Sequence, residues 1–195
     1  DALAIEVGPW STRYAVELIK NGAGTLETWQ ARSGHGFAFP FLFFAEESKA
    51  AEKMALRSPD KIEPLWGLDQ EFVGSGASLL PILQREAKTD AQKAAVESFG
   101  AAQSKDPMMV GSIDGPAIDS LASAFAGNAI VGEIMTALRM TSAIYAPYTR
   151  GTGRFYEANL KRENYMKSNF VAAYNRAKSK LGRDPRVLVK LGGNH

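Results

Sequence analysis

The sequence predicts an α/β fold in which a parallel central sheet is flanked by helices and interrupted by a long helical insertion. Three short apolar segments, residues 2–7, 64–68 and 186–191, are each followed by a polar or glycine-rich turn. This pattern is typical of buried parallel strands. The sequence between these segments has the composition of helices, and strands that alternate with helices form parallel sheets.

Helix boundaries are marked by proline, glycine and hydroxyl residues. Pro9 and the hydroxyl residues that follow Trp10 are typical of a helix start, and Gly182 followed by Pro185 is typical of a helix end. Two helical pairs are expected in the middle of the chain. The expected helices cover residues 10–20, 43–57, 78–88, 90–103, 114–125, 128–145 and 157–181.

The middle helices form the predicted insertion, residues 76–150, which we expect to lie over one end of the sheet. All 195 residues would belong to a single α/β domain. Three strands make a thin sheet for a chain of this length, and the chain begins with Asp1 rather than Met. We therefore expect at least one further strand before Asp1, and a chain truncated at one or both ends.

Composition and charge exclude several classes of function. The net charge is only +2, with basic and acidic residues interspersed, so no nucleic-acid partner is predicted. The absence of cysteine excludes disulfides, thiolate metal sites and cysteine nucleophiles. The apolar run at residues 37–45 is far shorter than the ~20 residues that span a bilayer. It predicts a buried turn and helix start, or the lining of an apolar cleft, in a soluble protein, cytoplasmic or secreted, of undetermined oligomeric state.

Side chains that could take part in catalysis or ligand binding lie at the carboxyl ends of the predicted strands. Glu6 lies in the first, Asp69 follows the second, and Asn194 and His195 follow the third. Ligands bind beyond the carboxyl ends of open parallel sheets, so we expect these side chains to meet in one crevice. Alternatively, Glu6 caps a helix, Asp69 forms a turn and His195 is solvated. A site is favoured because a carboxylate inside an apolar strand is costly unless it is paired.

Arg162 is the candidate partner for such a carboxylate. The apolar stripe of the last predicted helix, extended one turn backwards, reaches Arg162, close to a helix N-terminus that disfavours cations. Pairing with a buried carboxylate, or holding a ligand oxygen, would explain this placement, whereas the alternative is an arginine that extends into water. Asn169 lies near the same face, and His35 is a loop candidate beside the aromatic run. The stripe consists of Met166, Phe170, Tyr174, Ala177 and Leu181.

Four segments resemble the erythromycin esterase family. They are ALAIEVGPWS, LWGLDQEF, KRENYMKSNF and RVLVKLGGNH, which occur in the family's order and span nearly the whole chain. The resemblance implies an α/β fold with a site at the carboxyl ends of the sheet, and a bacterial hydrolase connected with antibiotic resistance. It also implies that Glu6, Arg162 and His195 match the family's site carboxylate, arginine and second histidine. Asp69 matches its Gly-x-Asp strand end.

The family's first motif, a strand that ends in Gly-Glu-x-x-His, is absent here and would precede Asp1. The resemblance implies that its histidine activates water. More distant relatives bind haem or act as metal-dependent proteases, so the resemblance bears more directly on the fold than on the reaction.

The expected function is hydrolysis of an ester or similar carbonyl group in a small molecule. Arg162 would stabilise the oxyanion, and His195 would act as an acid or base or position the substrate. Glu6 and Asp69 complete the expected catalytic set, and the expected substrate-binding residues are His35, Asn169 and Asn194. The alternative is a non-catalytic ligand-, haem- or metal-binding domain that uses His195 and the two carboxylates. No cofactor is expected for the hydrolase, whereas the alternative includes a divalent metal.

Overall fold

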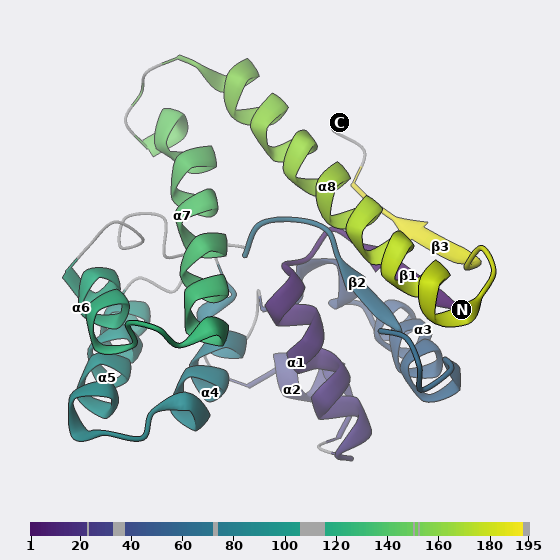
Figure 1. Ribbon diagram of the computed structural model, residues 1–195, viewed down its shortest axis with the longest axis horizontal. Helices are drawn as coiled ribbons and strands as arrows, with labels where there is room; N and C mark the ends of the chain where they lie inside the picture. The colour runs from purple at the N-terminus through teal and green to yellow at the C-terminus, as the bar shows by residue number, and fades with distance from the viewer. Residues whose placement is uncertain are drawn as a thin grey trace.

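The computed structural model describes most of the chain, namely residues 1–22, 24–32, 38–71, 74–105, 116–149, 151 and 153–192. These residues form a small three-stranded parallel sheet with helices packed on both of its faces (Figure 1). The predicted α/β fold class is thereby confirmed.

The helices and strands follow one another along the chain in an order that places β1 first and β3 last. They are β1 (Ala2–Ile5), α1 (Pro9–Lys20), α2 (Leu26–Gln30), η1 (Pro40–Leu42), α3 (Ala45–Arg57), β2 (Leu65–Gly67), α4 (Gly76–Glu86), α5 (Asp90–Lys105), α6 (Pro116–Ala124), α7 (Ala129–Thr149), α8 (Phe155–Leu181) and β3 (Val187–Lys190).

The sheet has the order β2-β1-β3, and both neighbours run parallel to the central strand β1. The register pairs Leu3 with Leu65 on one side and with Leu188 on the other. The three predicted strands are therefore neighbours in one sheet, although each is shorter than the apolar run that predicted it. Their carboxyl ends meet at one edge of the sheet. The first strand of this sheet is β1, and the further strand expected before Asp1 stays a prediction.

Two short helices were not predicted. α2 has five residues, too few for an apolar period to be recognised. It is capped by the hydroxyl of Thr25, which accepts a hydrogen bond from the Thr28 backbone N–H at 3.0 Å. The 3₁₀ helix η1 lies within the aromatic run. The longer helices agree with their predicted positions to within a few residues at each described end.

Successive side chains of β1 point to opposite faces of the sheet, so the apolar core is divided into two parts. Leu3 and Ile5 belong to a large apolar cluster with α1 and α3, whereas Ala2 and Ala4 pack with α8. Along α8 the predicted apolar stripe faces the sheet, with Met166, Ala177 and the neighbouring Ala173 buried and Phe170, Tyr174 and Leu181 partly buried.

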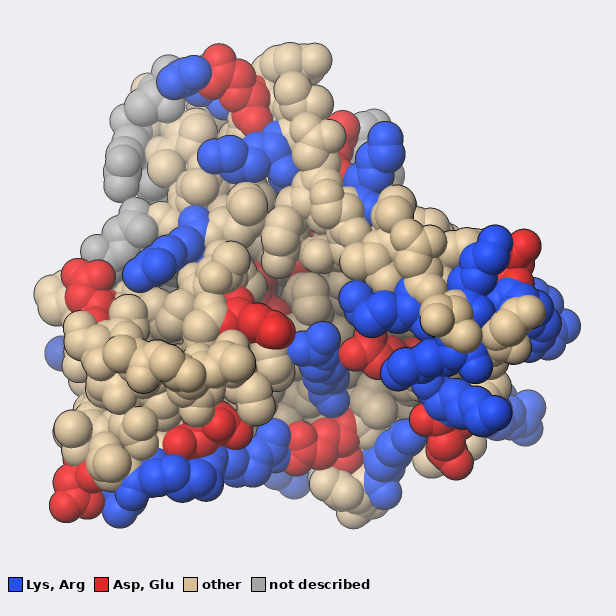
Figure 2. All heavy atoms as spheres, in the orientation of Figure 1, with Lys and Arg blue, Asp and Glu red and all other residues tan. Residues whose placement is uncertain are grey.

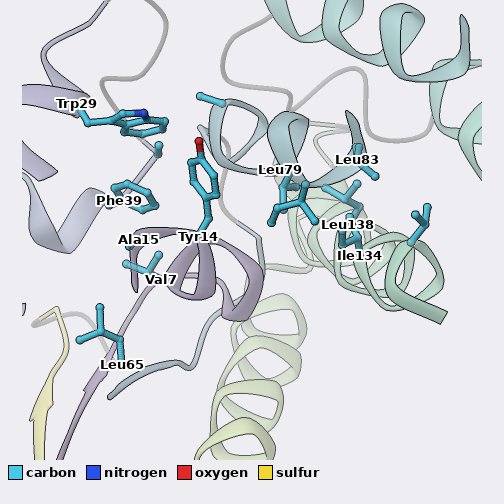
Figure 3. Close-up of a cluster of buried hydrophobic side chains, with 14 of the residues drawn as sticks. Val7, Tyr14, Ala15, Trp29, Phe39, Leu65, Leu79, Leu83, Ile134 and Leu138 are labelled. Carbon is cyan, nitrogen blue, oxygen red and sulfur yellow. The ribbon is translucent and has the colours of Figure 1, made fainter. Parts of the chain in front are cut away.

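The middle helices share the large core cluster with the sheet. Leu79 and Leu83 of α4 face Ile134 and Leu138 of α7 (Figure 3). The hydroxyl of Thr141, farther along α7, donates to the Glu71 backbone carbonyl at 2.7 Å. This contact places α7 at the carboxyl end of β2.

The aromatic run is divided between core and surface. Phe39 is fully buried and its ring centroid lies 5.1 Å from that of Trp29, so this part forms the expected buried turn. Phe43 and Phe44, at the start of α3, are 49% and 66% exposed. Phe37 lies outside the described residues.

Gly67 allows β2 to approach the start of α1. A Cβ at this position would lie 2.5 Å from the Gly8 carbonyl oxygen and 2.6 Å from the Pro9 Cα atom. We expect Gly67→Ala to lower the free energy of unfolding by about 1–3 kcal/mol, because backbone atoms cannot move aside without disturbing the sheet. Urea denaturation would measure this loss.

Gly132→Ala in α7 is the matched control. A Cβ at Gly132 meets no atom within 4 Å, so the helix should gain up to about 1 kcal/mol from the better helix former. Equal stabilities of the two variants would contradict the close packing of Gly67.

Candidate functional site

Two buried carboxylates stand at the carboxyl ends of neighbouring strands. Glu6 directly follows β1, and it belongs to the same face of the strand as Ala4, which packs against α8. Asp69 lies two residues beyond β2, and its backbone N–H donates to the Val7 carbonyl at 3.2 Å. The two residues are 4% and 1% exposed, so both need partners within the protein.

The guanidinium of Arg162, in the first half of α8, joins these two carboxylates. Its Nε atom donates to Asp69 Oδ1 and Oδ2 at 3.0 and 3.1 Å. Its Nη2 atom donates to Asp69 Oδ2 at 2.5 Å and also to Glu6 Oε1. The structure thus brings together three of the four expected catalytic residues. We call Glu6, Asp69 and Arg162 the strand-end cluster.

Burial and ion pairing shift the pKa values of Asp69 and Arg162 in opposite directions. Burial raises the pKa of Asp69, although the hydrogen bonds and charge of Arg162 oppose that shift. For Arg162, burial acts to lower the pKa, but the hydrogen bonds and charges of Asp69 and Glu6 outweigh it and hold the pKa above its usual range. Arg162 therefore remains a cation at neutral pH.

One amino group of Arg162 is left for a ligand. Its Nη1 atom makes no hydrogen bond to any residue that the structure describes, and the side chain is 22% exposed. The two carboxylates fix the plane of the guanidinium through its other nitrogen atoms. Arg162 can therefore donate a hydrogen bond in a fixed direction to a carbonyl oxygen or an oxyanion.

Glu6 also holds the end of the third strand. Its Oε2 atom accepts a hydrogen bond from the Gly192 backbone N–H at 2.6 Å. Glu6 therefore connects β1, α8 and the chain that leads out of β3. The next residues along that chain include Asn194 and His195, and these two candidates lie outside the described residues, as does His35.

Asn169, a predicted substrate-binding residue, supports the end of β2. Its Nδ2 atom donates to the Leu68 carbonyl at 2.8 Å, directly before Asp69. This hydrogen bond fixes α8 to the strand end two helical turns after Arg162. Asn169 thus helps to position the strand-end cluster.

Glu71 is a buried acid whose role the sequence analysis missed. Its Oε1 atom accepts from the Trp10 backbone N–H, and its Oε2 atom accepts from the Ser11 hydroxyl, both at 2.6 Å. Glu71 thereby caps the N-terminus of α1, whose own first turn contains no acidic residue. That missing local cap was the available signal for a partner elsewhere in the chain. Gly8 makes room for it, because a Cβ there would lie 2.3 Å from Glu71 Oε2.

Burial raises the pKa of Glu71 to about 7, although the hydrogen bonds from Ser11 and Trp10 oppose the shift. The carboxyl group therefore changes its protonation near neutral pH while it remains part of the α1 cap. This titration lies two residues along the chain from Asp69.

No cluster of three or more His, Cys, Asp or Glu side chains suited to a metal ion occurs among the residues described. None of the helices in that part of the chain is long and apolar enough to cross a membrane. Comparison with known proteins gives no match among family models, curated proteins or solved structures.

The pKa of Glu71 predicts how stability depends on pH. Because the pKa in the folded protein is about 7 and the ordinary value is 4.5, the folded state binds the proton more tightly. Protonated Glu71 therefore adds to the free energy of unfolding. This stabilisation is fully present below about pH 4.5 and is lost as the pH rises through 7, which lowers the free energy of unfolding by about 3 kcal/mol. Glu71→Gln should remove this pH dependence while its carboxamide keeps the contacts to Trp10 and Ser11.

Chemical denaturation between pH 4.5 and 8 would measure the effect as the difference between wild type and variant. Glu97→Gln, at an exposed position of α5, is the control. If the difference in free energy of unfolding between wild type and Glu71→Gln stays constant over this pH range, the raised pKa of Glu71 is contradicted.

Proposed function

We propose that this protein hydrolyses an ester or a similar carbonyl compound at the carboxyl ends of its parallel sheet. The proposal depends on one observation above all. Arg162 is held in plane by Glu6 and Asp69 and keeps Nη1 without a partner among the described residues. Such an arrangement suits a reaction in which negative charge develops on an oxygen atom.

The chemistry follows from the fixed direction of that donor. When water attacks a carbonyl group, the carbonyl oxygen acquires negative charge in the transition state. A donor that is already oriented stabilises this charge without reorganising, and one such donor contributes about 3–4 kcal/mol. Arg162 meets this requirement because both carboxylates hold it before a substrate arrives.

Proton transfer would fall to histidine. In the proposed mechanism His195 acts as an acid or base, or positions the substrate, on the chain that Glu6 holds through Gly192. As the resemblance to the erythromycin esterase family implies, a histidine before Asp1 would activate the water. That resemblance relies on the four sequence segments alone.

A metal-binding role is supported less well. A metal ion bound by Glu6 and Asp69 would need carboxylate oxygens that now accept hydrogen bonds from Arg162. The guanidinium already occupies the position of the cation, so a metal would have to displace it. Metal analysis and the absorption spectrum of the purified protein, set against hydrolysis of p-nitrophenyl esters, would distinguish the two functions.

Arg162→Lys tests the proposal most directly. Lysine keeps the charge but cannot hold two carboxylates and a substrate oxygen in one plane. We expect turnover of p-nitrophenyl acetate to fall by roughly 10²–10³-fold. We also expect a lower melting temperature, because the two buried carboxylates lose hydrogen bonds. Rates should therefore be measured well below the unfolding transition, with folding checked by circular dichroism.

Arg139→Lys, at an exposed position of α7, is the matched control and should change neither property. Near-native turnover by a folded Arg162→Lys variant would reject a catalytic role for Arg162. Absence of ester hydrolysis in wild-type protein that includes the residues before Asp1, across p-nitrophenyl esters from acetate to octanoate, would reject the proposed function.

A further inference from the structure

β2 has one edge that does not pair with another strand. The Pro64 carbonyl accepts from the Leu3 N–H at 2.8 Å, and the Leu68 N–H donates to the Ile5 carbonyl at 3.0 Å. Successive residues of a strand direct these groups to opposite sides, so those of Leu65 and Gly67 point away from β1. Within the part of the chain that the structure describes, these outward-facing groups have no hydrogen-bond partner.

A cleft of about 500 Å³ lies along this free edge. Leu65 and Gly67 line it, α1 and α8 form its sides, and α7 contributes Gly132. Figure 2 shows a hollow near the middle of the molecule, between the regions that α7 and α8 occupy in Figure 1. The volume is typical of a site for a small molecule.

The cleft leads towards the strand-end cluster. β2 runs from Leu65 to Gly67, and Asp69 follows two residues later. Tyr165 and Asn169 of α8 also line the cleft, and Tyr165 is only about 5 Å along the helix from Arg162. A chain that lies parallel to β2 in the cleft would therefore direct its carboxyl end towards Arg162.

The charges around the cleft balance one another. Arg13 lies 4.5 Å from the centre of the Trp10 ring and pairs with Glu63 at 3.4 Å. Arg176 pairs with the same glutamate at 3.2 Å, and Glu133 lies 3.8 Å from Arg13. Because these two cations and two anions neutralise each other, the cleft favours an uncharged ligand. The unpaired backbone groups of β2 favour one that contains amides.

We infer that this cleft binds a peptide-like acyl chain of the substrate, which adds to β2 as a short parallel strand. Its amides would pair with Leu65 and Gly67, and the carbonyl group at its end would lie beside Arg162. Main-chain pairing to a strand edge is an established mode of peptide recognition. The inference relies on the proposed function for the reaction, but the binding step can be tested separately.

A series of p-nitrophenyl esters tests the substrate class. The acyl groups are acetyl-Ala, acetyl-Ala-Ala and acetyl-Ala-Ala-Ala, and p-nitrophenyl octanoate provides a chain without amides. Each hydrogen-bonded amide should raise kcat/KM about fivefold. N-methylation of the middle alanine should remove the gain, and the octanoate should show none. Equal kcat/KM for all three peptide esters would overturn the inference.

Gly132→Leu blocks the cleft without touching the strand-end cluster. A side chain there enters open space, so the protein should fold normally. The variant should hydrolyse p-nitrophenyl acetate as fast as the wild type. Its kcat/KM should no longer rise as alanines are added to the acyl chain. Ala94→Leu, at an exposed position of α5, should keep that gain. A Gly132→Leu variant that keeps the full gain would place the acyl chain elsewhere and overturn the inference.

Equilibrium binding separates the two proposals. Trp10 and Trp66 line the cleft, so acetyl-Ala-Ala-Ala-amide should change tryptophan fluorescence in the wild type but not in Gly132→Leu. Binding without ester hydrolysis would support the cleft and reject the hydrolase. Hydrolysis of short esters without peptide binding or a length effect would reject the cleft and leave the hydrolase intact.

Discussion

The arrangement of the site depends on the pairing of one guanidinium with two buried carboxylates. Glu6 and Asp69 belong to different strands, and each would be costly in an apolar environment without a cation. Arg162 supplies that cation from a helix that also covers the sheet. Removal of Arg162 would leave two buried carboxylates without a cation, whereas removal of either carboxylate would leave the other one paired with Arg162. The core and the cluster must therefore form together, since the same contact between α8 and the sheet creates both.

The short segment after β2 distributes its acids between the two faces of the sheet. Asp69 contacts α8 on one side, and Glu71 caps α1 on the other. Residues 68–71 thus connect the end of β2 to the helices on both faces of the sheet. The Glu71 carbonyl also connects this segment to α7 by accepting a hydrogen bond from Thr141. The two acids differ in their partners. Asp69 meets a permanent cation, whereas Glu71 meets neutral donors and the helix dipole, which leaves its proton exchangeable near neutral pH.

Periodicity in the sequence predicted the three strands, the long helices and the placement of Arg162 on the apolar stripe of α8. Those features depend on patterns that lie within one element. The role of Glu71 could not be derived in this way, because its partner Trp10 is 61 residues away. The cleft was not predicted either, because it depends on how far α7 stands from β2. The hydrolase function and the family resemblance remain proposals, and His35, Asn194 and His195 lie outside the described residues.

The two outer strands of the sheet differ in their risk of self-association. β2 has only three residues, and residues of α1, α7 and α8 line the cleft along its free edge. β3 instead exposes Leu188 and Val189 to 60% and 47%. Exposed apolar side chains on an outer strand promote edge-to-edge aggregation. Among the described residues β3 is therefore the outer strand with the more exposed apolar side chains, and charged substitutions at Leu188 and Val189 should lower its tendency to associate with another sheet without affecting the strand-end cluster.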